Sequence, residues 1–220
     1  MSWSQDLAID STVSQENRFE SVSGDFSVVR FDNAPLPATT VKNVYDAIAH
    51  AVQNAEIIIS ELFGSITIRE DTEIEAADVS QLRLVSSTSR GATVESNSVV
   101  FSKFVDGADG CFGIIAADFV DADELYPYLP AERVRRDAIT IVMIQALPSG
   151  STKPSSNEEK MVVGTRWTCM KLTHSGLEIP KDCLAELQES SMAWGDTMKK
   201  CIMQYLAKQN AGDDKQLTTK

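Results

Sequence analysis

The residues that most often carry out catalysis are scarce in this chain and poorly placed for it. Its two histidines are His50, on the polar side of a helical pattern, and His174, in a predicted turn. A nucleophilic hydrolase needs a base, usually histidine, beside its serine or cysteine. The sequence also lacks the GxSxG, GxGxxG, P-loop and HExxH motifs. We therefore expect a protein that is not an enzyme.

Metal chemistry has little support either. The four cysteines, between Cys111 and Cys201, are spaced too widely for a CxxC site. An acidic run from Glu70 to Asp78 offers oxygen ligands for calcium, but it lacks the glycine and the ligand spacing of an EF-hand. We interpret this run as a solvated loop, and we expect neither a metal nor a cofactor.

The charge balance is strongly acidic, with a formal net charge of −12 at pH 7 and a pI near 4.6. Nucleic-acid binding relies on lysine and arginine to neutralise phosphates, so we exclude it. For the same reason we expect at most transient membrane contact. The basic residues Arg133, Arg135, Arg136, Lys153 and Lys160 are diluted by acidic neighbours, and we interpret them as a solvated surface.

Residues 1–15 are polar and acidic and have no apolar core of a signal peptide. No run approaches the ~18 apolar residues of a membrane span. At 220 residues the chain is long enough for one sizeable core. We expect a disordered segment over 1–15, one domain over 16–208 and a flexible tail over 209–220, in a reduced, cytoplasmic protein.

The longest regular pattern runs from Pro180 to Lys208, and it predicts an amphipathic helix roughly 40 Å long. Its larger side chains recur every three or four residues, at Leu184, Leu187, Trp194, Met198, Cys201 and Tyr205, with Ser191 in the remaining position. Serine, methionine and Gly195 dilute the leucine and isoleucine of a tight core. Two interpretations of Gly195 stay open: a strand approaches the helix closely, or an adaptable helix surface forms one wall of an apolar cavity.

A second helical pattern covers residues 38–62 and ends at Gly64. Most of the rest has strand character, with turn signals between the segments. The segments are 19–31, with a hairpin turn at Ser23-Gly24-Asp25, then 66–69, 82–85, 92–95, 98–105, 112–120, 138–147 and 161–172. Together they indicate an antiparallel meander, with a flexible loop over 148–160.

Strand 161–172 has two alternating sets of side chains, and either set can face inward. One set contains Trp167 and the other contains Arg166. A buried Arg166 needs a carboxylate partner, for which Asp118 is a candidate.

The order of these elements resembles the START-like (StAR-related lipid transfer) domains of the helix-grip superfamily. The residues that carry the resemblance are the strand Met161-Val162-Val163-Gly164-Thr165-Arg166-Trp167-Thr168, the pair Ile179-Pro180, the helix to Tyr205, the run from Ser98 to Val120, and Val134-Arg135-Arg136. The resemblance spans about residues 16–208. It implies an α+β helix-grip fold, in which a curved antiparallel sheet wraps around the long C-terminal helix.

This resemblance implies non-catalytic binding, transfer or sensing of a lipid or other apolar small molecule in an internal cavity. We expect the cavity between the sheet and the helix, lined by Leu184, Leu187, Ser191, Trp194, Met198, Cys201 and Tyr205, with Arg166 and Trp167 from the last strand. Two alternatives remain. One is a protein-interaction domain whose pocket is filled by its own side chains; the other is a cyclase-like or hydratase-like enzyme that uses Tyr205, His174 or an inward carboxylate.

Overall fold

The computed structural model describes residues 12–22, 24–36, 40–64, 66–70, 78–108, 110–148, 160–174 and 177–217. These residues form eight strands: β1 (Val13–Glu20), β2 (Phe26–Leu36), β3 (Ile66–Arg69), β4 (Val79–Ser87), β5 (Thr93–Gly107), β6 (Gly110–Phe119), β7 (Val134–Pro148) and β8 (Lys160–Thr173). They also form three helices: α1 (Val41–Gln53), α2 (Ala55–Phe63) and α3 (Lys181–Leu217).

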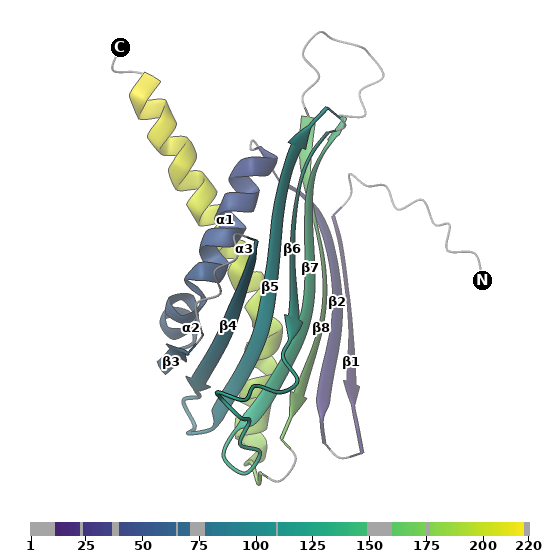
Figure 1. Ribbon diagram of the computed structural model, residues 1–220, viewed down its shortest axis with the longest axis vertical. Helices are drawn as coiled ribbons and strands as arrows, with labels where there is room; N and C mark the ends of the chain where they lie inside the picture. The colour runs from purple at the N-terminus through teal and green to yellow at the C-terminus, as the bar shows by residue number, and fades with distance from the viewer. Residues whose placement is uncertain are drawn as a thin grey trace, which may run out of the picture.

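The strands form one sheet in the order β1-β2-β8-β7-β6-β5-β4-β3, and neighbours in this order are antiparallel. A short parallel contact joins β5 to β7. All three helices lie on one side of the sheet, and α3 crosses that side diagonally (Figure 1). The predicted α+β helix-grip fold is therefore confirmed.

The first hairpin is confirmed as well, since Gly24 at its turn has a φ of 86°, which glycine adopts without strain. Strand β1 begins at Val13, inside the segment that we expected to be disordered; the first eleven residues lie outside the described residues. The reason is polar pairing with β2: the Ser14 hydroxyl donates to Asp32 at 2.8 Å, and Glu16 lies 3.8 Å from Arg30.

The helix predicted over 38–62 is two helices, α1 and α2, divided at Asn54. Thr40 caps the first, because its hydroxyl accepts a bond from the Asn43 backbone N–H. At the division, Asn54 donates from both its backbone N–H and its side-chain amide to the His50 carbonyl. The backbone bond is the ordinary helical one, whereas the side-chain bond competes with it for the same carbonyl. Gly64 ends α2 in the left-handed conformation, as predicted.

Helix α3 continues past Lys208, where we expected it to end, so the tail predicted to be flexible is helical as far as Leu217. No proline follows Lys208 to stop it. Residues 218–220 lie outside the described residues, as do most of the acidic run (71–77) and of the predicted loop (149–159). None of the described helices combines the length and apolar character needed to cross a membrane.

Two packed clusters hold the helices against the sheet. The α1 cluster contains Val44, Ile48, Val100, Ile144 and Leu206. The β7-start cluster contains Phe26, Val134, Leu172 and Leu187, which joins the beginning of α3 to the sheet. Full burial of one such side chain contributes about 1.5–3 kcal/mol. The stretch of β7 between these two clusters is the part that faces the candidate site.

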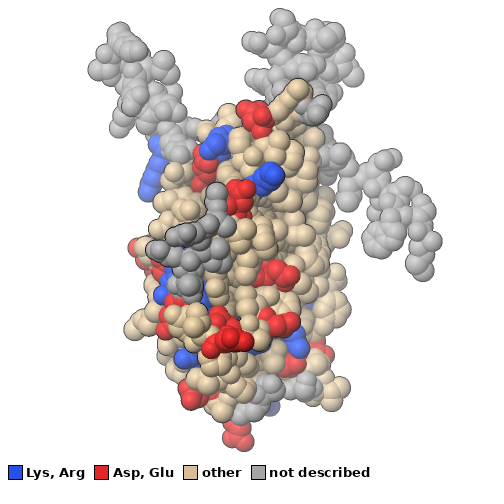
Figure 2. Space-filling view, in the orientation of Figure 1, with Lys and Arg blue, Asp and Glu red and all other residues tan. Residues whose placement is uncertain are grey.

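On the molecular face shown in Figure 2, the coloured acidic and basic side chains are interspersed among larger uncharged areas. The basic side chains coloured there do not merge into one continuous surface. This face therefore lacks, among its described residues, the basic footprint expected of a nucleic-acid-binding protein.

Candidate functional site

A cavity lies between α3 and the sheet. The backbone of α3 packs against α1 but makes few close approaches to the strands of the sheet. The cavity has a volume of about 300 Å³, and most side chains around it are apolar, among them Val28, Ile48, Leu84, Ile115, Val142 and Met203. Small-molecule sites occupy ~300–1,000 Å³. The space is therefore at the lower end of that range and suits one compact molecule.

Three of the helix residues predicted for the site line this cavity: Ser191, Trp194 and Met198. Trp194 also packs against the buried Ala55 and Ile59 of α2, so it forms the side wall between α2 and α3. Three further residues of α3 line the cavity without having been predicted, namely Lys199, Ile202 and Met203. Gly195, for which a cavity wall was one of two interpretations, lines it as well.

The other predicted helix residues lie away from the cavity. Leu187 is only 2% exposed and belongs to the β7-start cluster. The ring of Tyr205 stacks on His50 of α1, with 5.0 Å between the ring centroids. Leu184 and Cys201 are half-buried but do not line the cavity. One stripe of a 37-residue helix thus meets the β7-start cluster, the cavity and α1 in turn.

On β8, the alternating set that contains Arg166 faces the cavity. Trp167 belongs to the opposite set, is 37% exposed and lies between Phe31 of β2 and Ile141 of β7 on the outer face. Successive side chains of a strand point to opposite faces, so these two predicted residues cannot both reach the cavity. The structure brings Arg166 to it and leaves Trp167 outside.

The carboxylate partner of Arg166 is Asp32 of β2. Arg166 donates from Nε to Asp32 Oδ2 at 3.0 Å and makes a second bond from Nη2. The suggested partner Asp118 was wrong: it lies on β6 opposite Val99, and its carboxylate accepts the backbone N–H of Phe119. Asp32 and Arg166 are directly opposite each other on adjacent strands, a pairing that requires the β2–β8 register.

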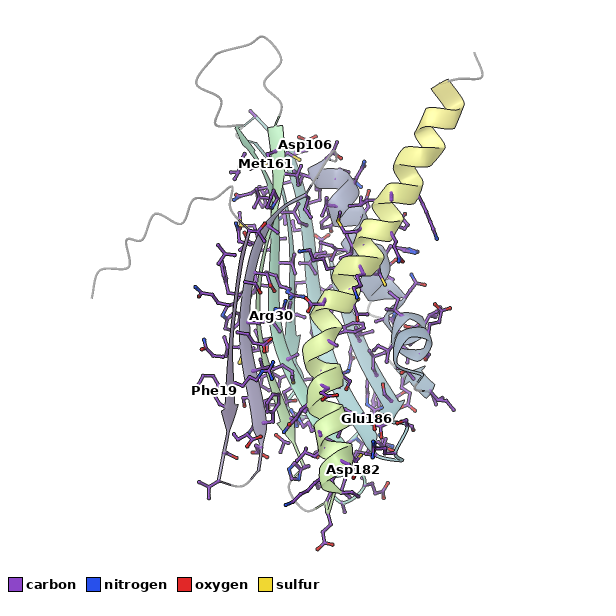
Figure 3. All side chains as sticks on the ribbon, turned by 180° about the vertical axis from the view of Figure 1, so that it is seen from behind. Phe19, Arg30, Asp106, Met161, Asp182 and Glu186 are labelled. Carbon is purple, nitrogen blue, oxygen red and sulfur yellow. The ribbon has the colours of Figure 1, made fainter. Side chains whose placement is uncertain are left out.

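A second ion pair links the sheet to the helix. Arg30 of β2 donates to both carboxylate oxygens of Asp196 on α3, at 2.7 and 3.2 Å, and its Nε donates to Asp32 at 3.1 Å. Figure 3 shows Arg30 between β2 and α3. Two arginines and two aspartates therefore connect β2, β8 and α3 beside the cavity.

These ion pairs shift the pKa values of Asp32 and Arg30. Burial opposes ionisation of Asp32, but hydrogen bonds from Ser14 and Arg166 and the charges of Arg166 and Arg30 outweigh it, so the pKa of Asp32 lies below its ordinary value. Burial likewise lowers the pKa of Arg30, but bonds to Asp196 and Asp32 outweigh this effect and raise it. Asp32 and Arg30 are consequently both charged at neutral pH.

Gly195 lies where the Arg166 guanidinium touches α3. A Cβ atom at position 195 would overlap Arg166 Nη1 and would lie 2.6 Å from its Cζ atom. Only glycine leaves room for this contact. Gly195 also lines the cavity, so both interpretations of this mid-helix glycine describe part of its role.

Arg136 is the residue whose position differs most from our sequence-based interpretation. Of the basic residues that we interpreted as a solvated surface, Arg133 pairs with Glu95 at 2.9 Å and Arg135 with Asp137 at 2.6 Å. Arg136 instead lines the cavity, and burial lowers its pKa because desolvation disfavours the charged form. The solvated interpretation was therefore wrong for Arg136; Lys153 lies outside the described residues.

Other polar residues at the cavity were missed as well, among them Arg30, Ser96 and Ser98. A signal existed for Arg30 and its neighbour Asp32, because they are charged residues on one face of an apolar strand. The arrangement as a whole can bury an apolar molecule and can offer it a few charged and hydroxyl groups.

No family model and no curated protein matches this sequence. Solved structures with similar folds include the human StarD13 (DLC2) lipid transfer and protein localization domain, with 10% identity, coverage of 88% of this chain and 91% of that chain, and a TM-score of 0.47. Another is the di-domain ARO/CYC BexL from the BE-7585A biosynthetic pathway, with 14% identity, coverage of 81% of this chain and 48% of that chain, and a TM-score of 0.37. A third is protein NE0264 from Nitrosomonas europaea, with 12% identity, coverage of 82% and 95%, and a TM-score of 0.33. Similarity at this level carries no information on what this chain binds.

Proposed function

We propose that this protein binds one compact lipid or other apolar small molecule between α3 and the sheet, without changing it chemically, as a carrier or a sensor. The supporting observation is a cavity of about 300 Å³ with mostly apolar walls, left between two closely packed clusters. Removing a ligand's apolar surface from water there contributes about 25 cal/mol per Å². Such binding needs no proton transfer.

The open cavity favours this proposal over a protein-interaction domain with a filled pocket. A filled pocket would leave no space of the size that small-molecule sites occupy. Ser191, Met198 and Gly195, which give α3 its unusual composition, all lie at the cavity. Their small or adaptable side chains leave a space that leucine or isoleucine would fill.

Non-catalytic binding is also favoured over a cyclase-like or hydratase-like reaction. Of the side chains suggested for catalysis, Tyr205 stacks on His50, and His174 lies within hydrogen-bond distance of the Gly24 carbonyl at 3.2 Å. Neither lines the cavity. Glu16 is the one carboxylate among the described lining residues, and it lies 3.8 Å from Arg30.

Native mass spectrometry of the purified protein tests the proposal, followed by organic extraction of whatever co-purifies. Met198→Trp should block the cavity, because a larger side chain on its helix wall overpacks it. Gln204→Trp makes the same addition at an exposed position of the same helix. We expect a stoichiometric apolar adduct in the wild type and in Gln204→Trp, and its loss in Met198→Trp.

Circular dichroism must show that both variants stay folded. A bare mass for the wild-type protein, together with no uptake from a mixed lipid pool, would contradict the proposal and favour the interaction domain. An adduct that survives in a folded Met198→Trp variant would place the ligand elsewhere.

A further inference from the structure

We propose that the ligand carries an anionic head group, a carboxylate or a phosphate, which Arg136 binds at one end of the cavity. This inference rests on the proposed function and narrows its ligand to an acidic amphiphile.

Arg136 occupies the end of the cavity that packing closes. It is the first residue of β7 that lines the cavity. The preceding residue on the same face, Val134, is fully buried in the β7-start cluster. From Arg136 onward the inward positions are Ala138, Thr140, Val142 and Ile144, so this wall of the cavity is mostly apolar. A molecule with its polar group at Arg136 would therefore lay its apolar part along this wall.

The guanidinium of Arg136 differs from the other arginines of the cavity in having no partner among the described residues. Arg30 pairs with Asp196 and Asp32, and Arg166 pairs with Asp32. Among the residues that the structure describes, none forms a hydrogen bond, ion pair or ring contact with the side chain of Arg136. Its side chain is half-buried and faces the cavity, and a charge partly withdrawn from water destabilises a protein unless something compensates it. A ligand anion supplies that compensation.

Two serines of β5 add donors at the same end. Strands β5 and β7 run parallel where Val94 pairs with Val134 and Glu95 with Arg135, so the next residue of β5, Ser96, lies beside Arg136. Ser96 and Ser98 both line the cavity, and neither hydroxyl has a hydrogen-bond partner among the described residues. A planar guanidinium and two hydroxyls form a donor set that suits carboxylate or phosphate oxygens.

The charge balance of the lining points the same way. In a chain with a formal charge of −12, the charged residues that line the cavity are Arg30, Arg136, Arg166 and Lys199 against Glu16. Lys199 is exposed, whereas Arg30 and Arg166 are already neutralised by aspartates. Among the described lining residues, Arg136 is accordingly the half-buried cation that is left to bind an anion.

Binding of dodecanoate, dodecyl phosphate and dodecanol, measured by isothermal titration calorimetry, tests this inference. The three probes share one chain and differ in the head group. We expect the wild type to bind both acids more tightly than the alcohol. Arg136→Met should weaken binding of the acids by roughly 10- to 100-fold, the usual effect of losing a charged hydrogen bond, and leave the alcohol unchanged. Lys103→Met, which removes a charge from an exposed position, should keep the preference for acids.

The outcomes separate this inference from the proposed function. Equal affinity of the wild type for dodecanol and both acids, or an acid preference that survives in Arg136→Met, would overturn the inference and leave apolar binding intact. Inorganic phosphate binding as tightly as dodecyl phosphate would also overturn it. Failure of all three dodecyl probes to bind would overturn the inference, whereas the mass-spectrometry and extraction experiment decides the proposed function. Arg136→Gln provides a second neutral variant if Arg136→Met does not fold.

Thermal unfolding of the unliganded protein gives an independent readout. Because the half-buried charge of Arg136 has no partner among the described residues, Arg136→Met should raise the melting temperature while it lowers affinity for the acids. A structural arginine would behave in the opposite way. A lower melting temperature for both Arg136→Met and Arg136→Gln would overturn the inference.

Discussion

Gly195→Ala offers the sharpest test of how α3 meets the sheet. In an ordinary helix interior this substitution stabilises by about 1 kcal/mol, because alanine has the better helix propensity. Here the added Cβ would overlap Arg166 Nη1 and would lie 2.7 Å from Nη2, which also bonds Asp32. The guanidinium must therefore move or the helix must shift.

The size of the effect follows from the bonds that this movement breaks. Arg166 holds Asp32 through Nε and Nη2, and a charged hydrogen bond contributes about 1.5–3 kcal/mol. Loss of one bond, offset by the gain of about 1 kcal/mol in propensity, leaves a net destabilisation of about 0.5–2 kcal/mol. Each kcal/mol corresponds to a fall of about 2–4 °C in the melting temperature of a chain of this size.

Urea denaturation of a double-mutant cycle isolates this contact. In an Arg166→Met background the guanidinium is gone, so Gly195→Ala should stabilise the protein by about 1 kcal/mol instead of destabilising it. The effects of Gly195→Ala on the free energy of unfolding in the two backgrounds then differ by roughly 1.5–3 kcal/mol, and this difference is the coupling free energy between residues 195 and 166. If Gly195→Ala stabilises both backgrounds equally, the contact has no energetic weight and the reasoning is refuted.

Three further predictions concern the ion network and the core. The pKa of Asp32 is depressed in the folded state, so its contribution to stability is present above its unfolded pKa of ~3.9 and is lost as the pH falls through the folded value. Denaturation at a series of acidic pH values should therefore show that the free energy of unfolding depends less on pH in Asp32→Asn than in the wild type. Asp196→Asn breaks the pair between Arg30 and α3, and because the Asp196 carboxylate is half exposed, the free energy of unfolding should change by less than about 1 kcal/mol. If this pair holds α3 against β2 beside the cavity, stopped-flow release of a bound fluorescent fatty acid should become faster, and an unchanged release rate would contradict that role. Leu187→Ala should lower the free energy of unfolding, measured by urea denaturation, by about 2–5 kcal/mol, because Leu187 is buried in the β7-start cluster. A decrease of less than about 1 kcal/mol would contradict that packing.

Local sequence signals were enough for most of the elements. The hairpin turn at Gly24, the helix end at Gly64 and the strands β3, β4, β6, β7 and β8 were predicted from residues that act within a few positions of each other. The segments 92–95 and 98–105, predicted as separate strands, form the single strand β5. The helix-grip fold followed from the order of these elements. The division of the first helical pattern at Asn54 was missed, because the apolar stripe continues across it while one side chain bonds the preceding turn.

The content of the cavity depended on the tertiary structure. The alternation in β8 shows that Arg166 and Trp167 face opposite ways, but only packing against α3 decides which of them faces inward. Sequence spacing likewise cannot identify Asp32 as the partner of Arg166, because 134 residues separate them and the strand register joins them. Arg136 looks like its solvated neighbours in the sequence.

The amino-acid sequence by itself thus determined an acidic chain, its strands, and a long helix too rich in small and adaptable side chains for a tight core. The tertiary structure alone decided that the space beside this helix stays open and that Arg136 faces it with no partner from the part of the chain that the structure describes. The physical reason is range: periodicity and turns arise from neighbouring residues, whereas a cavity and its charges arise from strands that pair across most of the chain.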